Sequence, residues 1–167
     1  MKIYWPVLGA INSNTEEFFY QKLNLTREND TLVSYLSSHG GEANVTSRII
    51  EKLSILPIET IVYSGRMAYS SGAIIYSAFK KRFAFKDSEF LIHECIPPKG
   101  VERGENFHEY DQQIWQFMSE HIGISVRQIE KIAKKGERMT SEQAFDIGLV
   151  DEIVNSSWRN FKDLIIL

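Results

Sequence analysis

The sequence predicts an α/β protein with a largely parallel sheet, and three observations lead to this fold class. Short apolar runs rich in β-branched and aromatic residues alternate with longer segments whose apolar residues recur every three or four positions. Glycine, proline or asparagine separates most of these segments, so strands and helices follow one another along the first half. A chain of 167 residues with 43% hydrophobic content can bury its own core, so we expect one domain.

The first half contains the alternation of strands and helices. Asn14, with Glu17 three residues later, has the spacing of a capping box and places a helix start there. Pro57 ends the second helix because proline lacks the backbone N–H that a helix needs. Asp87-Ser88 predicts a turn between two short strands. The expected elements are, in order, a strand over 3–8, the helix from Asn14, a strand over 31–36, a helix over 45–56, a strand over 58–63, a helix over 73–79, and strands over 82–85 and 90–93.

The second half is mostly helical. A polar loop over 97–106 precedes a helix over 107–122, whose aromatic and aliphatic side chains share one broad face. That face needs a cover, either from its own domain or from a second subunit. The remaining elements are a helix capped by Ser125 and Gln128, a helix capped by Thr140 and Gln143 that ends at Gly148, and a strand within 149–154.

The composition excludes several classes of protein. A net charge of −3, without a basic run containing aromatic residues, argues against nucleic-acid binding. No apolar run is long enough to cross a bilayer, and the single cysteine, Cys95, fits a reducing cytoplasm. We expect neither a metal nor a cofactor, because no glycine-rich phosphate loop is complete and no metal-binding spacing occurs among His39, His93, His108 and His121.

The residues with catalytic potential lie at the ends of expected strands. Ser70, within Met67–Ala73, stands between a strand and an apolar helix. It is either a helix N-cap or a nucleophile at the positive end of the helix dipole. A nucleophilic serine also needs a base and backbone donors for the oxyanion. His93 closes another strand and is the candidate base, while the N–H groups of Gly41 and Ser71 are the candidate donors.

Four ordered motifs resemble the Clp protease proteolytic subunit. The resemblance runs from about Ile3 to Val154, which is nearly the whole chain. The motifs are Ser37-Ser38-His39-Gly40-Gly41, Met67 to Ala73, Leu91-Ile92-His93, and Thr140 through Ala144 to Gly148-Leu149-Val150-Asp151.

This resemblance implies a ClpP or crotonase-like fold of repeated β-β-α units. It implies one domain over 1–155, with a protruding handle helix within about 100–135, and a C-terminal tail over 156–167. The handle of the family interlocks two heptameric rings around an enclosed chamber. The expected partners are therefore further copies of this chain, in a heptamer or tetradecamer, and an AAA+ unfoldase.

The resemblance also implies a serine-type endopeptidase that hydrolyses peptides or unfolded segments. Ser70 would be the nucleophile and His93 the general base, with Gly41 and Ser71 forming the oxyanion hole.

Three departures from the family pattern bear on activity and assembly. The triad aspartate of the family falls on Gly136, counted back from Asp151, so the adjacent Glu137 is the candidate third member. The chain begins essentially at the first strand, without the segment that forms axial pore loops in the family, which bears on docking to an unfoldase. The stretch between His93 and the handle is also shorter than in the family, and this leaves the oligomer size open.

Three functions stay open at this point. The first is a peptidase that acts through Ser70. The second is a weak or inactive homologue with a structural or binding role, and a carboxylate behind His93 would separate it from the first. The third is a crotonase-fold enzyme acting on acyl-thioesters, which would need neither Ser70 nor His93.

Overall fold

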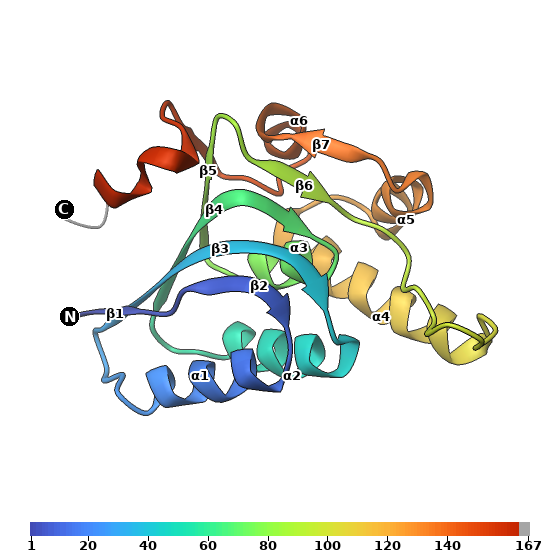
Figure 1. Ribbon diagram of the computed structural model, residues 1–167, viewed down its shortest axis with the longest axis horizontal. Coiled ribbons are helices and arrows are strands. Elements are labelled where there is room, and N and C mark those ends of the chain that lie inside the picture. The colour runs from blue at the N-terminus through green and yellow to red at the C-terminus, as the bar shows by residue number, and fades with distance from the viewer. Residues whose placement is uncertain (164–167) are drawn as a thin grey trace.

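The computed structural model describes residues 1–163 and has the α/β architecture that the sequence predicts (Figure 1). Its strands are β1 (Lys2–Tyr4), β2 (Val7–Ile11), β3 (Thr31–Gly41), β4 (Glu59–Tyr69), β5 (Lys81–Phe85), β6 (Glu89–Leu91), β7 (Arg138–Thr140) and β8 (Glu152–Val154). Its helices are α1 (Ser13–Leu23), α2 (Ala43–Ser54), α3 (Ser71–Ser77), α4 (Glu105–Ile122), α5 (Val126–Lys135) and α6 (Ser141–Asp146), followed by the 3-10 helix η1 (Trp158–Asp163).

Two long strands, β3 and β4, form the centre of the sheet. The main strand order is β1-β3-β4-β5-β8, while β2 also pairs with β3, and β6 with β4, further along those strands. Within the described residues every strand pairing is parallel except the antiparallel pair β6–β7. The prediction of a largely parallel sheet is therefore confirmed, and the carboxyl ends of β3, β4 and β6 meet at one edge.

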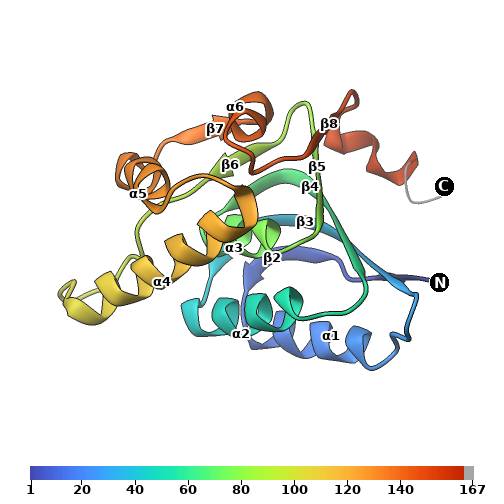
Figure 2. The ribbon, with the colours of Figure 1, turned by 180° about the vertical axis from the view of Figure 1, so that it is seen from behind.

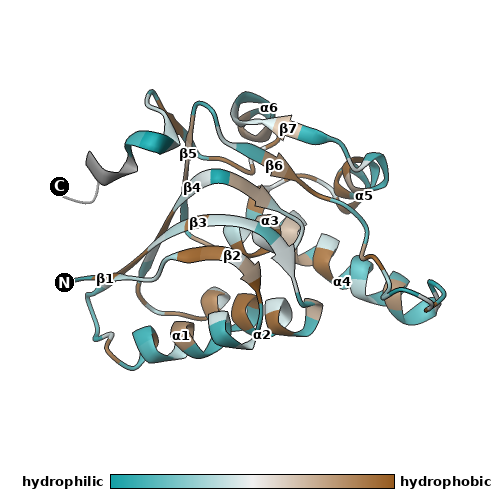
Figure 3. Ribbon diagram, viewed as in Figure 1, coloured by the Kyte–Doolittle hydropathy of each residue, from teal (hydrophilic) through white to brown (hydrophobic). Residues whose placement is uncertain are grey.

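Helices α1, α2 and α3 cover one face of this sheet, as the two opposite views show (Figures 1 and 2). Figure 3 shows hydrophobic residues along β2 and mixed stripes on α1 and α2, as expected for helices with one buried side. The core between sheet and helices contains large, fully buried side chains, among them Trp5, Phe19, Leu32, Ile49, Tyr76 and Phe90.

Helix α4 begins away from the body and returns to it along its length (Figure 2). Its second half is buried in the core of the same chain through Ile114, Trp115, Met118 and Ile122. The apolar face of this helix is thus covered by its own domain over these residues. None of the described helices is long and apolar enough to cross a membrane.

The structure corrects three details of the sequence prediction. The cap of α1 is Asn12 and not Asn14, because the Asn12 side chain accepts hydrogen bonds from the N–H groups of Asn14 and Thr15. The first expected strand is two strands, interrupted around Pro6. Strand β7, which the sequence does not predict, pairs with β6 just after the Gly136 turn.

Asp151, at the end of the fourth sequence motif, forms an ion pair with the buried guanidinium of Arg82. Arg82 is nearly buried, and its Nη2 lies 2.7 Å from the Asp151 carboxylate. The same carboxylate accepts from the Arg82 backbone N–H at 2.8 Å, and Arg82 also donates to the carbonyl of His121. A buried charge needs such partners, so this pair fixes the start of β5 against the segment that leads into β8.

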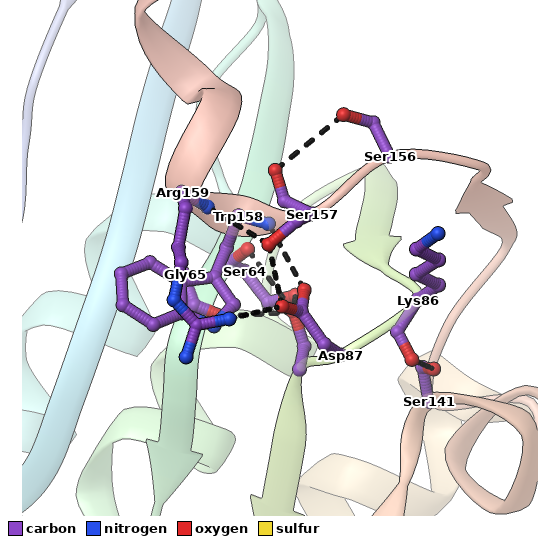
Figure 4. Close-up of polar contacts among 10 residues, drawn as sticks. Ser64, Gly65, Lys86, Asp87, Ser141, Ser156, Ser157, Trp158 and Arg159 are labelled. Atoms are coloured by element: carbon purple, nitrogen blue, oxygen red, sulfur yellow. Dashed lines mark hydrogen bonds and ion pairs between the residues drawn. The ribbon is translucent and has the colours of Figure 1, made fainter.

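The start of the C-terminal tail, which the sequence did not place, is held by Asp87 in the β5–β6 turn (Figure 4). The Asp87 carboxylate accepts from the Ser157 hydroxyl at 2.5 Å, from the Trp158 N–H at 3.0 Å and from Arg159 at 3.2 Å. Burial raises the pKa of this carboxyl, but the hydrogen bonds from Ser157 and Trp158 outweigh it and hold the pKa below its usual value.

This lowered pKa predicts a stability contribution that acid removes. An acid with a depressed pKa in the folded state stabilises the fold above its unfolded pKa, about 3.9 for aspartate, and the contribution disappears as pH falls through the folded pKa. We expect Asp87→Asn to lower the free energy of unfolding at pH 7, and this difference should vanish in strong acid. Urea unfolding at several pH values measures it, with the exposed Asp146→Asn as control. A difference independent of pH would contradict the assignment.

Candidate active site

Three neighbouring parallel strands bring the candidate residues together. Gly41 ends β3, Ser70 follows the last residue of β4, and His93 comes two residues after β6. Tyr69 is paired with Leu91 in the sheet, and the Ser70 N–H donates to the Leu91 carbonyl at 2.8 Å. The carboxyl ends of parallel strands are where α/β folds place functional groups, and here they converge on one edge.

Ser70 stands in a strained backbone conformation between β4 and α3. Its φ of 54° and ψ of −124° lie in a region that residues with a side chain rarely adopt. It occupies the N-cap position of α3, but its side chain makes no capping hydrogen bond. The geometry therefore does not support the interpretation of the Ser70 side chain as a helix cap, and the hydroxyl is not engaged by the start of α3.

Two glycines allow the end of β3 to approach its neighbours, Gly40 towards Ser70 and Gly41 towards Ile11 of β2. A Cβ on Gly40 would lie 2.8 Å from the Ser70 Cβ, and a Cβ on Gly41 would lie 2.0 Å from the Ile11 carbonyl oxygen. The Ser38 hydroxyl, which donates to the Gly9 carbonyl, accepts from the Gly40 N–H and fixes this turn.

The end of β3 and the start of α3 lie side by side at Ser70. The N–H of Glu42 donates to the Ile11 carbonyl at 2.9 Å, which holds the end of β3 against β2. The Ser71 hydroxyl donates to the Gly41 carbonyl at 3.3 Å, which places the polar atoms of Gly41 beside the start of α3. Ser71 is the first residue of α3, and the first N–H groups of a helix have no partner within it.

His93 has one ring nitrogen occupied by a backbone group. Its Nδ1 lies 2.6 Å from the carbonyl oxygen of Glu94. Because a carbonyl oxygen can only accept, Nδ1 carries the proton in the neutral ring, and Nε2 keeps its lone pair. This is the tautomer that a general base acting through Nε2 requires.

Ser70, Ser71, Gly41 and His93 line one pocket of about 540 Å³. Helix α4 and the segment after β6 close its sides. Most of the wall is apolar and is contributed by Ile74, Ile92, Ile96, Phe107, Ile114 and Trp115.

Two titratable side chains in the pocket wall are kept neutral. Burial raises the pKa of the Cys95 thiol, and the nearby Asp111 carboxylate raises it further. Because the thiolate is the reactive form, this environment disfavours Cys95 as a nucleophile and leaves Ser70 as the candidate. Burial also raises the pKa of Tyr110 to about 12, and its hydroxyl donates to the Ala43 carbonyl at 3.3 Å.

Gly136, and not the carboxylate of Glu137, stands beside His93. Gly136 ends α5 in the left-handed conformation, with a φ of 58°, and a Cβ built on it would lie 3.9 Å from the His93 Cβ. The side chain of Glu137 is 72% exposed and its carboxylate lies 3.5 Å from Lys135. The structure thus brings together Ser70, Ser71, Gly41 and His93, and it places Glu137 at the surface.

A polar cluster that none of the sequence motifs contains lies behind His93. Asp111 is buried on α4, where one carboxylate oxygen accepts from the Cys95 N–H at 2.8 Å and the other binds Arg103. Arg103 also donates to the Cys95 carbonyl. A signal was available, because Asp111 is a lone carboxylate at a position of the apolar stripe of its helix.

Fold and pocket together define the class: an α/β protein with a serine and a histidine at the carboxyl ends of adjacent parallel strands. The model of the Clp protease family matches residues 7–157, so the chain belongs to the Clp protease family. The resemblance seen in the four sequence motifs is thereby confirmed.

Known members of the family are distant relatives of this chain. It is 27% identical over 133 residues to the ATP-dependent Clp protease proteolytic subunit 2 of Corynebacterium diphtheriae, a match that covers 74% of this chain and 66% of that protein. It is 28% identical over 166 residues to the proteolytic subunit of Streptococcus sanguinis, covering 89% and 83%. The chain therefore spans slightly less than two thirds of the length of the Corynebacterium relative.

Solved structures have the same fold. ClpP1 from Listeria monocytogenes superposes with a TM-score of 0.82 at 25% identity, over 92% of this chain and 91% of that one. A point mutant of the same protein gives a TM-score of 0.83. The predicted fold class is confirmed.

Proposed function

We propose that this protein is a serine-type endopeptidase of the Clp proteolytic-subunit kind, which hydrolyses peptides or unfolded segments by acyl transfer through Ser70. The observation that carries the proposal is the strained, uncapped Ser70 in one pocket with His93. Family membership supports the same class of reaction.

In the proposed reaction, the Ser70 hydroxyl attacks the carbonyl carbon of the scissile peptide bond. His93 Nε2 takes the hydroxyl proton as general base and then gives it to the leaving amine. The N–H groups of Gly41 and Ser71 donate to the oxyanion of the tetrahedral intermediate. Water then attacks the acyl-enzyme by the same route, which releases the carboxylate product and restores Ser70.

The proposal extends to assembly and location. The relatives bear the name of proteolytic subunits, and those from Corynebacterium and Streptococcus are called ATP-dependent. We infer a homo-oligomer, with a ring of seven or a double ring of fourteen as the candidate form and a Clp ATPase as candidate partner. We place the protein in the cytoplasm, where its single thiol, Cys95, stays reduced.

The test of the proposed function is hydrolysis of an internally quenched peptide by the purified protein. We expect cleavage that stops after preincubation with a fluorophosphonate, because this reagent reacts with activated serine hydroxyls. An acyl-thioester assayed in parallel distinguishes a peptidase from a crotonase-type enzyme. Cleavage that continues unchanged after the reagent, or turnover of the thioester alone, would overturn the proposal.

A further inference from the structure

The peptide group between Glu94 and Cys95 is held at both of its polar atoms. Its carbonyl oxygen lies 2.6 Å from His93 Nδ1, and its N–H donates to an oxygen of the Asp111 carboxylate at 2.8 Å. The described residues contain no cis peptide bond, so the C=O and N–H of this planar group point in opposite directions. The result is a continuous chain from the imidazole, through one peptide plane, to a carboxylate.

Asp111 is fixed in place by its surroundings. The residue is only 3% exposed, and its second carboxylate oxygen binds the Arg103 guanidinium. Arg103 also donates to the carbonyl of Cys95. The backbone N–H and C=O of Cys95 are therefore both bound, one by Asp111 and the other by Arg103. A buried carboxylate with such partners keeps its geometry, because moving it would leave a charge without compensation.

In the family pattern a carboxylate stands next to the histidine. The residue at that position in this chain is Gly136, which has no side chain. We infer that Asp111 is the positioning carboxylate of this protein and acts on His93 through the Glu94–Cys95 peptide. This inference rests on the proposed role of His93 as the base.

The physical effect of such a chain is cooperative. Hydrogen bonds that share a peptide group polarise one another, and a negative charge at the N–H end makes the carbonyl a stronger acceptor. The carbonyl then holds the proton on His93 Nδ1 and fixes the orientation of the ring. In the neutral ring Nε2 then carries the lone pair that is needed to accept the proton of Ser70.

The first test is Asp111→Asn, which keeps the shape of the side chain and removes its charge. We expect kcat for peptide hydrolysis to fall by about tenfold or more, with little change in KM, because groups that orient a functional histidine have effects of this size or larger. The control is Glu109→Gln, which removes an exposed carboxylate from the same helix and should leave kcat unchanged.

Rescue distinguishes positioning from a general structural role. Gly136→Asp supplies a carboxylate directly beside His93, so the double variant Gly136→Asp with Asp111→Asn should be as active as Gly136→Asp alone. Full activity of Asp111→Asn would overturn the inference. So would a folded Asp111→Asn protein whose peptide hydrolysis is not restored by adding Gly136→Asp. Should Asp111→Asn not fold, Arg103→Gln removes the cation that binds Asp111 and the Cys95 carbonyl, and this variant must show the same loss of activity and the same rescue.

A spectroscopic readout separates this inference from the proposed function. The ¹⁵N chemical shifts of the His93 ring report its tautomer without any catalysis. We expect the Nδ1–H form in the native protein and a mixture of tautomers in Asp111→Asn. An unchanged tautomer would refute the role of Asp111, whereas a changed tautomer in a protein that cleaves no peptide would refute only the proposed function.

Discussion

Ser70→Ala is expected to lower kcat/KM for peptide hydrolysis by at least about 50-fold. Removing the serine from a complete triad costs about 2 × 10⁶ in kcat, and removing the acid alone costs about 3 × 10⁴. In a protein with no substitute for the acid, removing the serine would therefore still lower kcat by about 70-fold. The fall in kcat on removing Ser70 is larger if another group replaces the missing triad carboxylate.

The matched control for this substitution is Ser54→Ala. Ser54 is an exposed serine at the end of α2, and its hydroxyl donates to the Glu51 carbonyl within its own helix. Peptide hydrolysis should be unchanged in this variant. If Ser70→Ala kept most of the wild-type rate, the nucleophile would have to be another residue.

Gly136→Asp is expected to raise kcat at least about tenfold, because a missing triad acid costs up to about 10⁴. The built Cβ at this position has no contact closer than 3.8 Å, so the first side-chain atom fits without a clash. The left-handed conformation at Gly136 is one that aspartate tolerates better than most residues. The new carboxylate can then accept a hydrogen bond from the Nδ1–H of His93 in place of the Glu94 carbonyl.

Gly136→Asn is the control that separates charge from shape. Asparagine also tolerates the left-handed conformation, but its neutral amide stabilises the imidazolium far less than a carboxylate does. We therefore expect little gain from asparagine. An equal gain from both variants, or a loss from aspartate in a folded protein, would show that His93 does not use a carboxylate at this position.

Much of the fold follows from the sequence because its determinants are local. Alternating apolar runs predict the strands and helices of the first half, and the capping boxes at Ser125 and Thr140 are confirmed in the structure. The capping-box spacing at Asn14 is wrong for the start of α1, because several polar residues lie there and only the backbone geometry selects Asn12. Strand β7 was missed because three residues with one antiparallel partner leave no periodicity to detect.

The candidate site was predictable only in part, for a similar reason. Gly41 ends one strand, and Ser70 and His93 follow the ends of two others, so parallel pairing of those strands is enough to bring them together. The direction of a side chain after a left-handed glycine does not follow from spacing, and Glu137 in fact lies at the surface beside Lys135. The Asp111 carboxylate reaches His93 only through a backbone peptide 16 residues away from it in sequence, which no motif encodes.

The most direct test of the account is the position of a covalent adduct. The purified protein is treated with a fluorophosphonate, digested, and the modified peptide is identified by mass spectrometry. We predict a single adduct on the hydroxyl of Ser70, formed in the wild type and in Ser54→Ala but absent from Ser70→Ala. An adduct on any other residue, or an unmodified wild-type protein at both neutral and mildly alkaline pH, would contradict the assignment of Ser70 as the nucleophile.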